Sequence, residues 1–365
     1  MIYFLSLSLI LILSSIWIVL KRPTRRKYSM LFLGIVSFTA MLVLSGARGL
    51  KIGTDTEMYV RYFNSVEGLR DLSSYADRFE TVYRIFNCLI AQIFGDAHAL
   101  LFLSTLVTLT LFYILFYKKS KVPWYSILMF LFLMFYYNSM CLLRQYIAMA
   151  VTSIALIYLG DKKYISFIVI ALIAGNIHSS AFIILIMLPL SMVKITRKRR
   201  VPVIVAAIAI SLSMDKIISI LIRLMPRYAT YLGSGYYLEN QLGTFLKSCV
   251  WTLMFFVVDY AYFKYSVNED EAQESPLWNR IEYYCGLLGF SITLASMHGA
   301  ILERMSYYFA VIYCVSVANA LNKFKRRRSK YRVAFAIMCG SIVYNLVILG
   351  LRPYWSGVIP YIFWE

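Results

Sequence analysis

NSMCLLRQ at residues 138–145 and GNIHSSA at residues 175–181 enclose the segment around which the chain is organised. Between them lie two apolar stretches joined by GDKK at residues 160–163, a pattern that predicts a helical hairpin. Short loops rich in Lys and Arg stay on the cytoplasmic side of a membrane. The lysine turn is therefore expected inside, and Arg144 and His178 are expected to meet at the outer face.

The composition indicates a membrane protein throughout. The 365 residues are 61% hydrophobic, with a mean hydropathy of +0.69. Apolar runs of ~20 residues, long enough to cross a hydrocarbon core of ~30 Å, recur along the whole chain. We expect an all-α polytopic protein that forms a single integral membrane domain over residues 1–365. About twelve spans are predicted, at 2–20, 29–47, 99–117, 124–142, 145–160, 164–177, 179–194, 201–218, 244–263, 281–299, 304–322 and 332–350.

The positive charge follows the predicted topology. The formal net charge is +19, and 24 of the 37 Lys and Arg residues fall in the loops expected inside. Topology explains such a charge better than nucleic-acid binding does, and it places both termini outside. The six cysteines are scattered through apolar segments, which indicates neither a disulfide nor a zinc site. The inner loops are residues 21–27, 118–121, 162–163, 194–200, 264–280 and 323–332.

Residues 79–95 are apolar, but counting them as a span would move every later loop to the opposite side of the membrane and place the basic inner loops outside. Glu80 and Arg84 lie one turn apart there, a pairing typical of a helix at a surface. We expect a non-spanning helix on the outer side. The outer segments are then loops 48–98 and 219–243 and the tail 351–365.

The basic residues left outside are mostly arginines, against the topological bias. The guanidinium fork suits bidentate contact with phosphate better than a lysine does, which predicts an anionic ligand on the outer face. Arg144, between two apolar helices, is the strongest candidate; an arginine that only reaches the headgroups is the alternative. The other candidates for the ligand are Arg48, Arg227, Arg304 and Arg352.

Two residues are candidates for a general base. Asp55 lies in GARGLKIGTDTEMY at residues 46–59, where it can accept a proton, bind a divalent cation with Glu57, or simply pair with Arg48. His178 opens a helix, whose amide end favours anions, although a capped interfacial histidine would look the same. The sequence does not choose between Asp55 and His178. Nucleotide-binding and redox-cofactor motifs are absent from it, so no cofactor is expected.

Several short motifs, in order over residues 40–310, resemble the EpsG family of Wzy-type polymerases of exopolysaccharide and O-antigen. One departure is Thr56, where that family usually has an aromatic residue after the aspartate. The motifs are Arg48 followed by Gly53-Thr54-Asp55 with Tyr59, Asn138 before Arg144-Gln145, His178-Ser179-Ser180-Ala181, and Arg304 with Tyr307 and Phe309.

The resemblance implies a membrane glycosyltransferase with a GT-C-like helical fold. Such an enzyme would join oligosaccharide repeat units carried on undecaprenyl diphosphate, at the outer face of the bacterial cytoplasmic (inner) membrane. A flippase and a chain-length regulator would be its pathway partners. The lipid diphosphate is already an activated leaving group, so we expect no metal. The expected substrate-binding residues are Arg48, Arg144, Gln145, Arg227, Arg304, Arg352, Tyr59, Asn138 and Tyr307, with Asp55 or His178 as the base.

Proteins of other classes share parts of this pattern. An O-antigen ligase would differ only in its acceptor. A lipid-linked oligosaccharide flippase or other transporter would carry charges near mid-membrane, where Asp259 is an unexplained example. A membrane scaffold would not need so many outer arginines. The order of preference is polymerase, ligase, transporter and scaffold.

Overall fold

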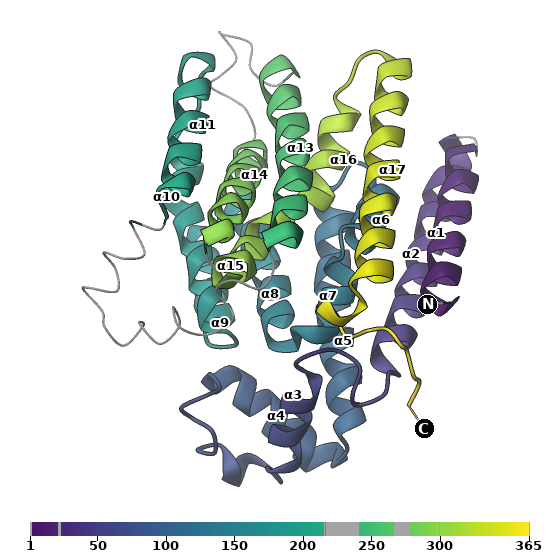
Figure 1. The fold of residues 1–365 in the computed structure, drawn as a ribbon, viewed down its shortest axis with the longest axis vertical. Helices are drawn as coiled ribbons and strands as arrows, with labels where there is room; N and C mark the ends of the chain where they lie inside the picture. Colours follow the sequence, from purple (N-terminus) through teal and green to yellow (C-terminus); the bar gives the residue numbers. More distant parts are fainter. Residues whose placement is uncertain are drawn as a thin grey trace. The chain divides into compact units, whose positions relative to one another are not determined.

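The computed structural model describes residues 2–20, 23–214, 216, 241–265, 277–298 and 300–364. Within these ranges the chain is helical, and the single β-type pairing is an isolated antiparallel bridge between Arg48 and Phe363. The chain forms two compact units, which are considered separately (Figure 1). The first comprises residues 1–155, 165–182 and 331–365, and the second comprises 156–164 and 183–330.

The first unit is built from long helices with clear local signals. The Asp96 side chain accepts the His98 N–H at the start of α5, and α5 ends with Lys118 and Lys119 in its last turn, where cations are favoured. Pro123 opens α6 with its fixed φ. The helices of this unit are α1 (Ile2–Leu20), α2 (Pro23–Gly46), α3 (Thr56–Asn64), α4 (Thr81–Phe94), α5 (Ala97–Lys119), α6 (Pro123–Phe132), α7 (Phe135–Cys141), most of α8 (Leu143–Gly160) and of α9 (Tyr164–Gly175), and most of α17 (Arg327–Leu351).

Side-chain contacts show how the helices of this unit run past one another. The Tyr117 hydroxyl donates to Met30 O at 2.8 Å, so the end of α5 lies beside the start of α2. The Tyr125 hydroxyl donates to Ala334 O at 3.1 Å, so the start of α6 lies beside the start of α17. At the other end, Trp364 N–H donates to Ala47 O at 2.9 Å. The basic helix ends therefore gather at one end of the unit, and the loop after α2 and the tail gather at the other.

Five helices are long and apolar enough to cross a membrane in the described part of the chain. A sixth span arises if α6 and α7, bent by 54° at their junction, count as one. These six correspond to six of the twelve predicted spans; within the described residues the other six do not lie on helices that meet this test of length and hydropathy. The five are Tyr28–Gly46, Ala97–Lys119, Leu143–Gly160, Gly243–Lys264 and Arg327–Leu351.

Helices α3 and α4 lie against α5 (Figure 1). Helix α4 has 14 residues, or ~21 Å at ~1.5 Å per residue, too short for the hydrocarbon core. It stops at Gly95, whose φ of +63° gives the left-handed end that glycine allows. This length fits the prediction of a non-spanning helix at 79–95.

The second unit packs around α14. Its helices are α10 (Met187–Met192), α11 (Arg197–Leu212), α13 (Gln241–Tyr265), α14 (Leu277–Ala295), α15 (Ala300–Ala310) and α16 (Tyr313–Asn322). The rings of Phe255 on α13 and Phe290 on α14 stack with centroids 5.4 Å apart. The predicted span 304–322 is two helices here, because the chain turns between Ala310 and Tyr313.

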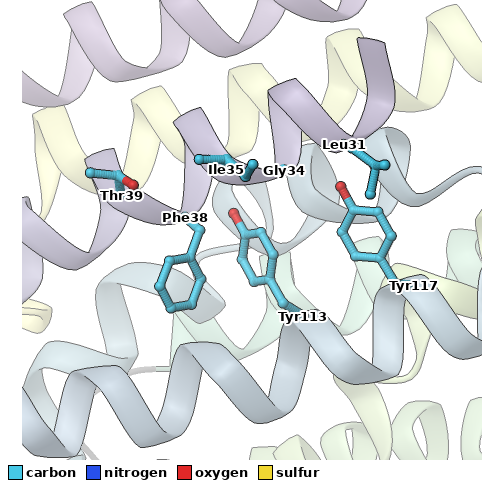
Figure 2. A pocket seen from close by; sticks show the side chains of 7 residues that line it. All are labelled: Leu31, Gly34, Ile35, Phe38, Thr39, Tyr113 and Tyr117. Atoms are coloured by element: carbon cyan, nitrogen blue, oxygen red, sulfur yellow. The ribbon is translucent and has the colours of Figure 1, made fainter. Parts of the chain in front are cut away.

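An apolar groove lies along the contact between α2 and α5 in the first unit (Figure 2). Tyr113 and Tyr117 rise from α5 toward α2 on either side of it, and Gly34 makes room, since a Cβ there would lie within 3 Å of the Tyr117 ring. None of its lining residues is charged, so this groove is unsuited to a diphosphate. The lining residues are Leu31, Gly34, Ile35, Phe38, Thr39, Tyr113 and Tyr117.

Candidate functional site

The carboxylate of Glu80 joins the two ends of the hairpin singled out in the sequence. Its Oε2 accepts Arg144 Nη1–H at 2.5 Å. Its Oε1 accepts the Ser179 backbone N–H at 2.7 Å and lies 3.5 Å from His178 Nδ1, within ion-pair range. Arg144 and His178 therefore come together in the first unit, as expected, with Glu80 between them.

Arg144 begins α8 and has its side chain only 15% exposed. Beyond Glu80, its Nη1 donates to Arg78 O at 3.1 Å. Its Nε–H is buried and has no hydrogen-bond partner among the residues that the structure describes. A buried donor left without a partner costs about 1–3 kcal/mol, so an anionic group or a water placed there would be bound favourably.

Aromatic rings support the Arg144 guanidinium from one side. Its Cζ lies 4.9 Å from the centroid of the Phe79 ring and 5.9 Å from that of Tyr83. Tyr59 is 4% exposed and packs on both rings, at 6.3 and 5.9 Å. Tyr59, expected to touch the ligand, is thus buried beneath Arg144, where its contacts with these rings hold α3 and α4 together.

His178 follows α9, immediately before the 3-10 helix η2 (Ser179–Ile186). A backbone bond from Val82 N–H to Asn176 O, at 2.9 Å, fastens the start of α4 to this turn. The His178 side chain is 22% exposed, so its ring is accessible at one edge. Its Nδ1 faces Glu80 Oε1 at 3.5 Å without forming a hydrogen bond in the described part of the chain, and Nε2 is the other ring nitrogen.

The environment of Glu80 favours its charged form. Burial raises the pKa of this carboxyl, but the contact with His178, the Ser179 N–H and the charge of Arg144 together lower it to about 2, from an ordinary value of 4.5. At neutral pH the cluster therefore contains a carboxylate held between a guanidinium and an imidazole.

Arg48 has a different environment from the one expected for a ligand-binding residue. Its side chain is fully buried, and it donates from Nε to Ile52 O at 3.3 Å, from Nη2 to Met140 O at 3.1 Å, and from Nη1 to Ser45 O. Burial lowers the pKa of Arg48 to about 10, which still leaves it charged at neutral pH. This guanidinium holds the loop after α2 against the end of α7.

Asp55 occupies the start of α3, at the end of that loop. Gly53, with φ of +100°, donates its N–H to Gly357 O at 2.9 Å. A Cβ on Gly53 would lie 2.5 Å from Met140 O, so only glycine fits. Thr56, the departure from the family pattern, is buried and donates to Ile52 O at 2.7 Å. Asp55 is half-buried, one turn before Tyr59 on the same side of α3.

Asn138 and Gln145 flank the break between α7 and α8. Asn138 is half-buried, and its carbonyl accepts the Leu142 N–H at 3.0 Å, which ends α7. Gln145 is 3% exposed and follows Arg144 directly. In the tail, Arg352 donates to the Tyr354 hydroxyl at 2.5 Å and lies over the Trp355 ring at 5.6 Å.

The remaining predicted residues belong to the second unit. Arg304 on α15 is exposed. Tyr307 is 5% exposed; its hydroxyl donates to Glu303 Oε1 at 2.5 Å and accepts from Lys247 Nζ at 2.7 Å. Tyr307 thus belongs to a buried network with Lys247 and Glu303. Arg227 lies outside the described residues, as do the other residues from 219 to 240.

Glu80 is the functional candidate that the sequence analysis missed. It was expected to pair with Arg84, but Arg84 donates to Leu72 O and to Thr81 Oγ1 instead. The available signal was a carboxylate at the start of an outer helix, on the same predicted face as an arginine and a histidine that both lacked a counter-charge.

The helices long enough to cross a membrane, together with a charged and partly buried cluster at one end of the first unit, indicate a multi-pass membrane protein that carries a polar cluster. Residues 30–363, nearly the whole chain, match the EpsG family. The chain therefore belongs to the EpsG family, which is the Wzy-type polymerase family. Comparisons with curated proteins and with solved structures found no match.

Proposed function

We propose that this protein is a polysaccharide polymerase that joins oligosaccharide repeat units carried on undecaprenyl diphosphate. The observation that supports it most directly is the convergence of Arg144 and His178 on Glu80. Family membership supports the same class of reaction. We further propose a GT-C-like arrangement of about twelve crossings, with the cluster at the outer face of the bacterial cytoplasmic membrane.

The proposed step is a single displacement. An acceptor sugar hydroxyl attacks the anomeric carbon of the donor glycan, the bond from that carbon to the diphosphate oxygen breaks, and the lipid diphosphate leaves with the electron pair. The hydroxyl proton passes to a base, for which His178 Nε2 is preferred and Asp55 is the alternative. The anomeric centre is inverted.

Arg144 would act on the charge that develops on the leaving diphosphate. Fixed donors aimed at developing charge are often the largest contribution to catalysis, because they need no reorganisation during the reaction. The Phe79 and Tyr83 rings and the bond to Glu80 keep the guanidinium in place. Arg304, Arg352 and Arg227 remain proposed contacts with the diphosphate or glycan, whereas we assign Arg48 the task of positioning the Asp55 loop.

The test deletes the gene and displays the surface glycan on a gel. Complementation with the wild-type gene is expected to restore a ladder, and Arg144→Ala is expected to leave single repeat units. Arg61→Ala is the matched control, because Arg61 is exposed on α3 and, among the described residues, forms an ion pair with Glu57 alone, one turn away at 3.1 Å. That variant should restore the full ladder.

Other outcomes separate the alternatives. A deletion strain without any surface glycan, single units included, would favour a ligase or a flippase. A deletion strain with an unchanged ladder would rule out the polymerase.

A further inference from the structure

Glu80 uses both carboxylate oxygens on groups from two other segments of the chain. Oε2 binds Arg144 at the start of α8, and Oε1 binds the Ser179 N–H and contacts His178 after α9. A carboxylate that served only as the counter-ion of Arg144 would not need the second set of contacts. We propose that Glu80 is a positioning residue, which holds Arg144 in place and fixes the Nδ1 proton of His178 so that Nε2 accepts the proton of the acceptor hydroxyl. This inference rests on the proposed polymerase function.

The local structure of α4 supports this role. Glu80 is the N-cap residue of α4, with extended backbone angles of −70° and 154°, yet its side chain makes no cap bond to its own helix. A side-chain cap is typically worth ~1 kcal/mol. The side chain instead reaches the first N–H of η2, a helix 99 residues further along the chain. The carboxylate is thus directed away from local helix capping and toward the cluster.

No other charge competes for the Glu80 carboxylate in the contacts that the structure describes. Arg84, one turn later on the same helix, is held by Leu72 O and Thr81 Oγ1. The charged or titratable groups that face Glu80 are Arg144 from α8 and His178 from the end of α9. His178 Nδ1 lies 3.5 Å from Glu80 Oε1 and has no other hydrogen-bond partner in the described chain, so a small approach of the ring would form an Nδ1–H bond to this carboxylate. A histidine with one nitrogen bound to a carboxylate has a fixed tautomer and orientation, and its other nitrogen is then available as the base.

Substitution by glutamine removes the charge while keeping the shape. A glutamine amide has a single acceptor oxygen, and its NH₂ group would face either Arg144 or the Ser179 N–H, donor against donor. Glu80→Gln is therefore expected to release Arg144 or His178. Glu80→Asp keeps both acceptor oxygens but is one methylene shorter, so partial activity is expected.

The test is a double-mutant cycle on the glycan ladder, measured as polymerised repeat units per amount of membrane protein. Glu80→Gln is expected to lower polymerisation about 100-fold, the scale of a lost general base. Glu80→Asp should recover part of it. In a His178→Ala background, Glu80→Gln should lower the remaining activity by a clearly smaller factor than in the wild-type background, because the part of its effect that acts through His178 is already lost and only the part through Arg144 remains. Glu57→Gln is the control, as this exposed glutamate is ion-paired with Arg61 on its own helix and with no other residue of the described chain.

Three results would overturn the proposal. They are wild-type activity in Glu80→Gln, an equal loss from Glu80→Gln in both backgrounds, and wild-type activity in His178→Ala. If the Glu80→Gln protein does not accumulate, the same cycle is run with Glu80→Asp and read by the same criteria. Failure of the wild-type gene to restore any ladder would instead refute the polymerase function, so the two failures are distinguishable.

Discussion

Arg144 combines a full charge with a side chain only 15% exposed, and such a charge is stable only with a partner. Glu80 is that partner, supplied from a segment 64 residues earlier. The pair does not use all the donors of the guanidinium, since Nε–H is buried and unpartnered within the described chain.

The lowered pKa of Glu80 predicts how stability depends on pH. A carboxyl whose folded pKa is about 2, against an ordinary 4.5, stabilises the fold fully above pH 4.5, and this contribution is lost as the pH falls through 2. At neutral pH the ionised Glu80 contributes on the order of 3 kcal/mol to the free energy of unfolding. Melting of the detergent-solubilised protein should show Glu80→Gln well below wild type at pH 7.

The difference in melting temperature between wild type and Glu80→Gln should narrow progressively between pH 4.5 and 2. Glu57→Gln, an exposed pair, should show a small difference at both ends of this range. A constant gap for Glu80→Gln at all pH values would mean that the charge of Glu80 contributes nothing to stability.

Sequence reasoning found Arg144 and His178 but not the carboxylate between them. The positive-inside rule placed Arg144 and His178 at one face, because it depends only on loop charge. It could not pair them with Glu80, since a partner 64 or 98 residues away depends on tertiary packing. The burial of Tyr59 was equally invisible, because a tyrosine beside a candidate site has the same sequence signal whether it faces ligand or core.

At the scale of elements, the loop from Gly46 to Thr56 is held by bonds that its glycines make possible. Gly53 approaches the end of α7 and bonds to Gly357, and Gly357 itself has φ of +60° and lies close to Thr54. In the sequence, glycines at positions 46, 49 and 53 are typical of a tightly turning loop. The sequence could not show that the tail closes over this loop, which is a contact across some 300 residues.

Gly53→Ala is therefore expected to destabilise the protein by about 1–3 kcal/mol, through backbone strain and the clash with Met140 O. The displaced loop should also carry Asp55 out of position and reduce polymerisation. Gly340→Ala is the matched control, because a Cβ there meets nothing within 4 Å and alanine is the better helix former. Thermal unfolding and ladder intensity measure both effects; equal melting temperatures would contradict the assigned strain.

Also at the scale of elements, the pairing of Asp259 matters because a charge expected near mid-membrane would favour a transporter over a site at one face. Asp259 on α13 is fully buried, as a transport path would require. Both of its oxygens are bound by Arg200 of α11, with Nε to Oδ1 at 3.0 Å. Arg200 comes from the basic loop predicted to lie inside, so Asp259 fastens that loop to α13 and is explained without a transport path.

For the whole molecule, the sidedness of the first unit matters most to the proposed function. The start of α2, the end of α5 and the start of α17 lie at one end and include Lys118, Lys119 and Arg332. The Glu80 cluster lies at the other end, where α8 begins and α9 ends. If the basic end faces the cytoplasm, as loop charge predicts, the cluster opens to the outside, where a lipid-linked glycan would be polymerised.

Labelling with a membrane-impermeant maleimide tests this orientation. Asp77→Cys, in the exposed loop before Glu80, should react in intact spheroplasts, whereas Lys118→Cys, at the exposed end of α5, should react only after permeabilisation. The wild-type protein serves as the blank, because Cys249 is already exposed. The opposite labelling would place the cluster in the cytoplasm. The bilayer would then separate it from any substrate displayed outside, and no outer-face polymerisation at Arg144 and His178 would be possible.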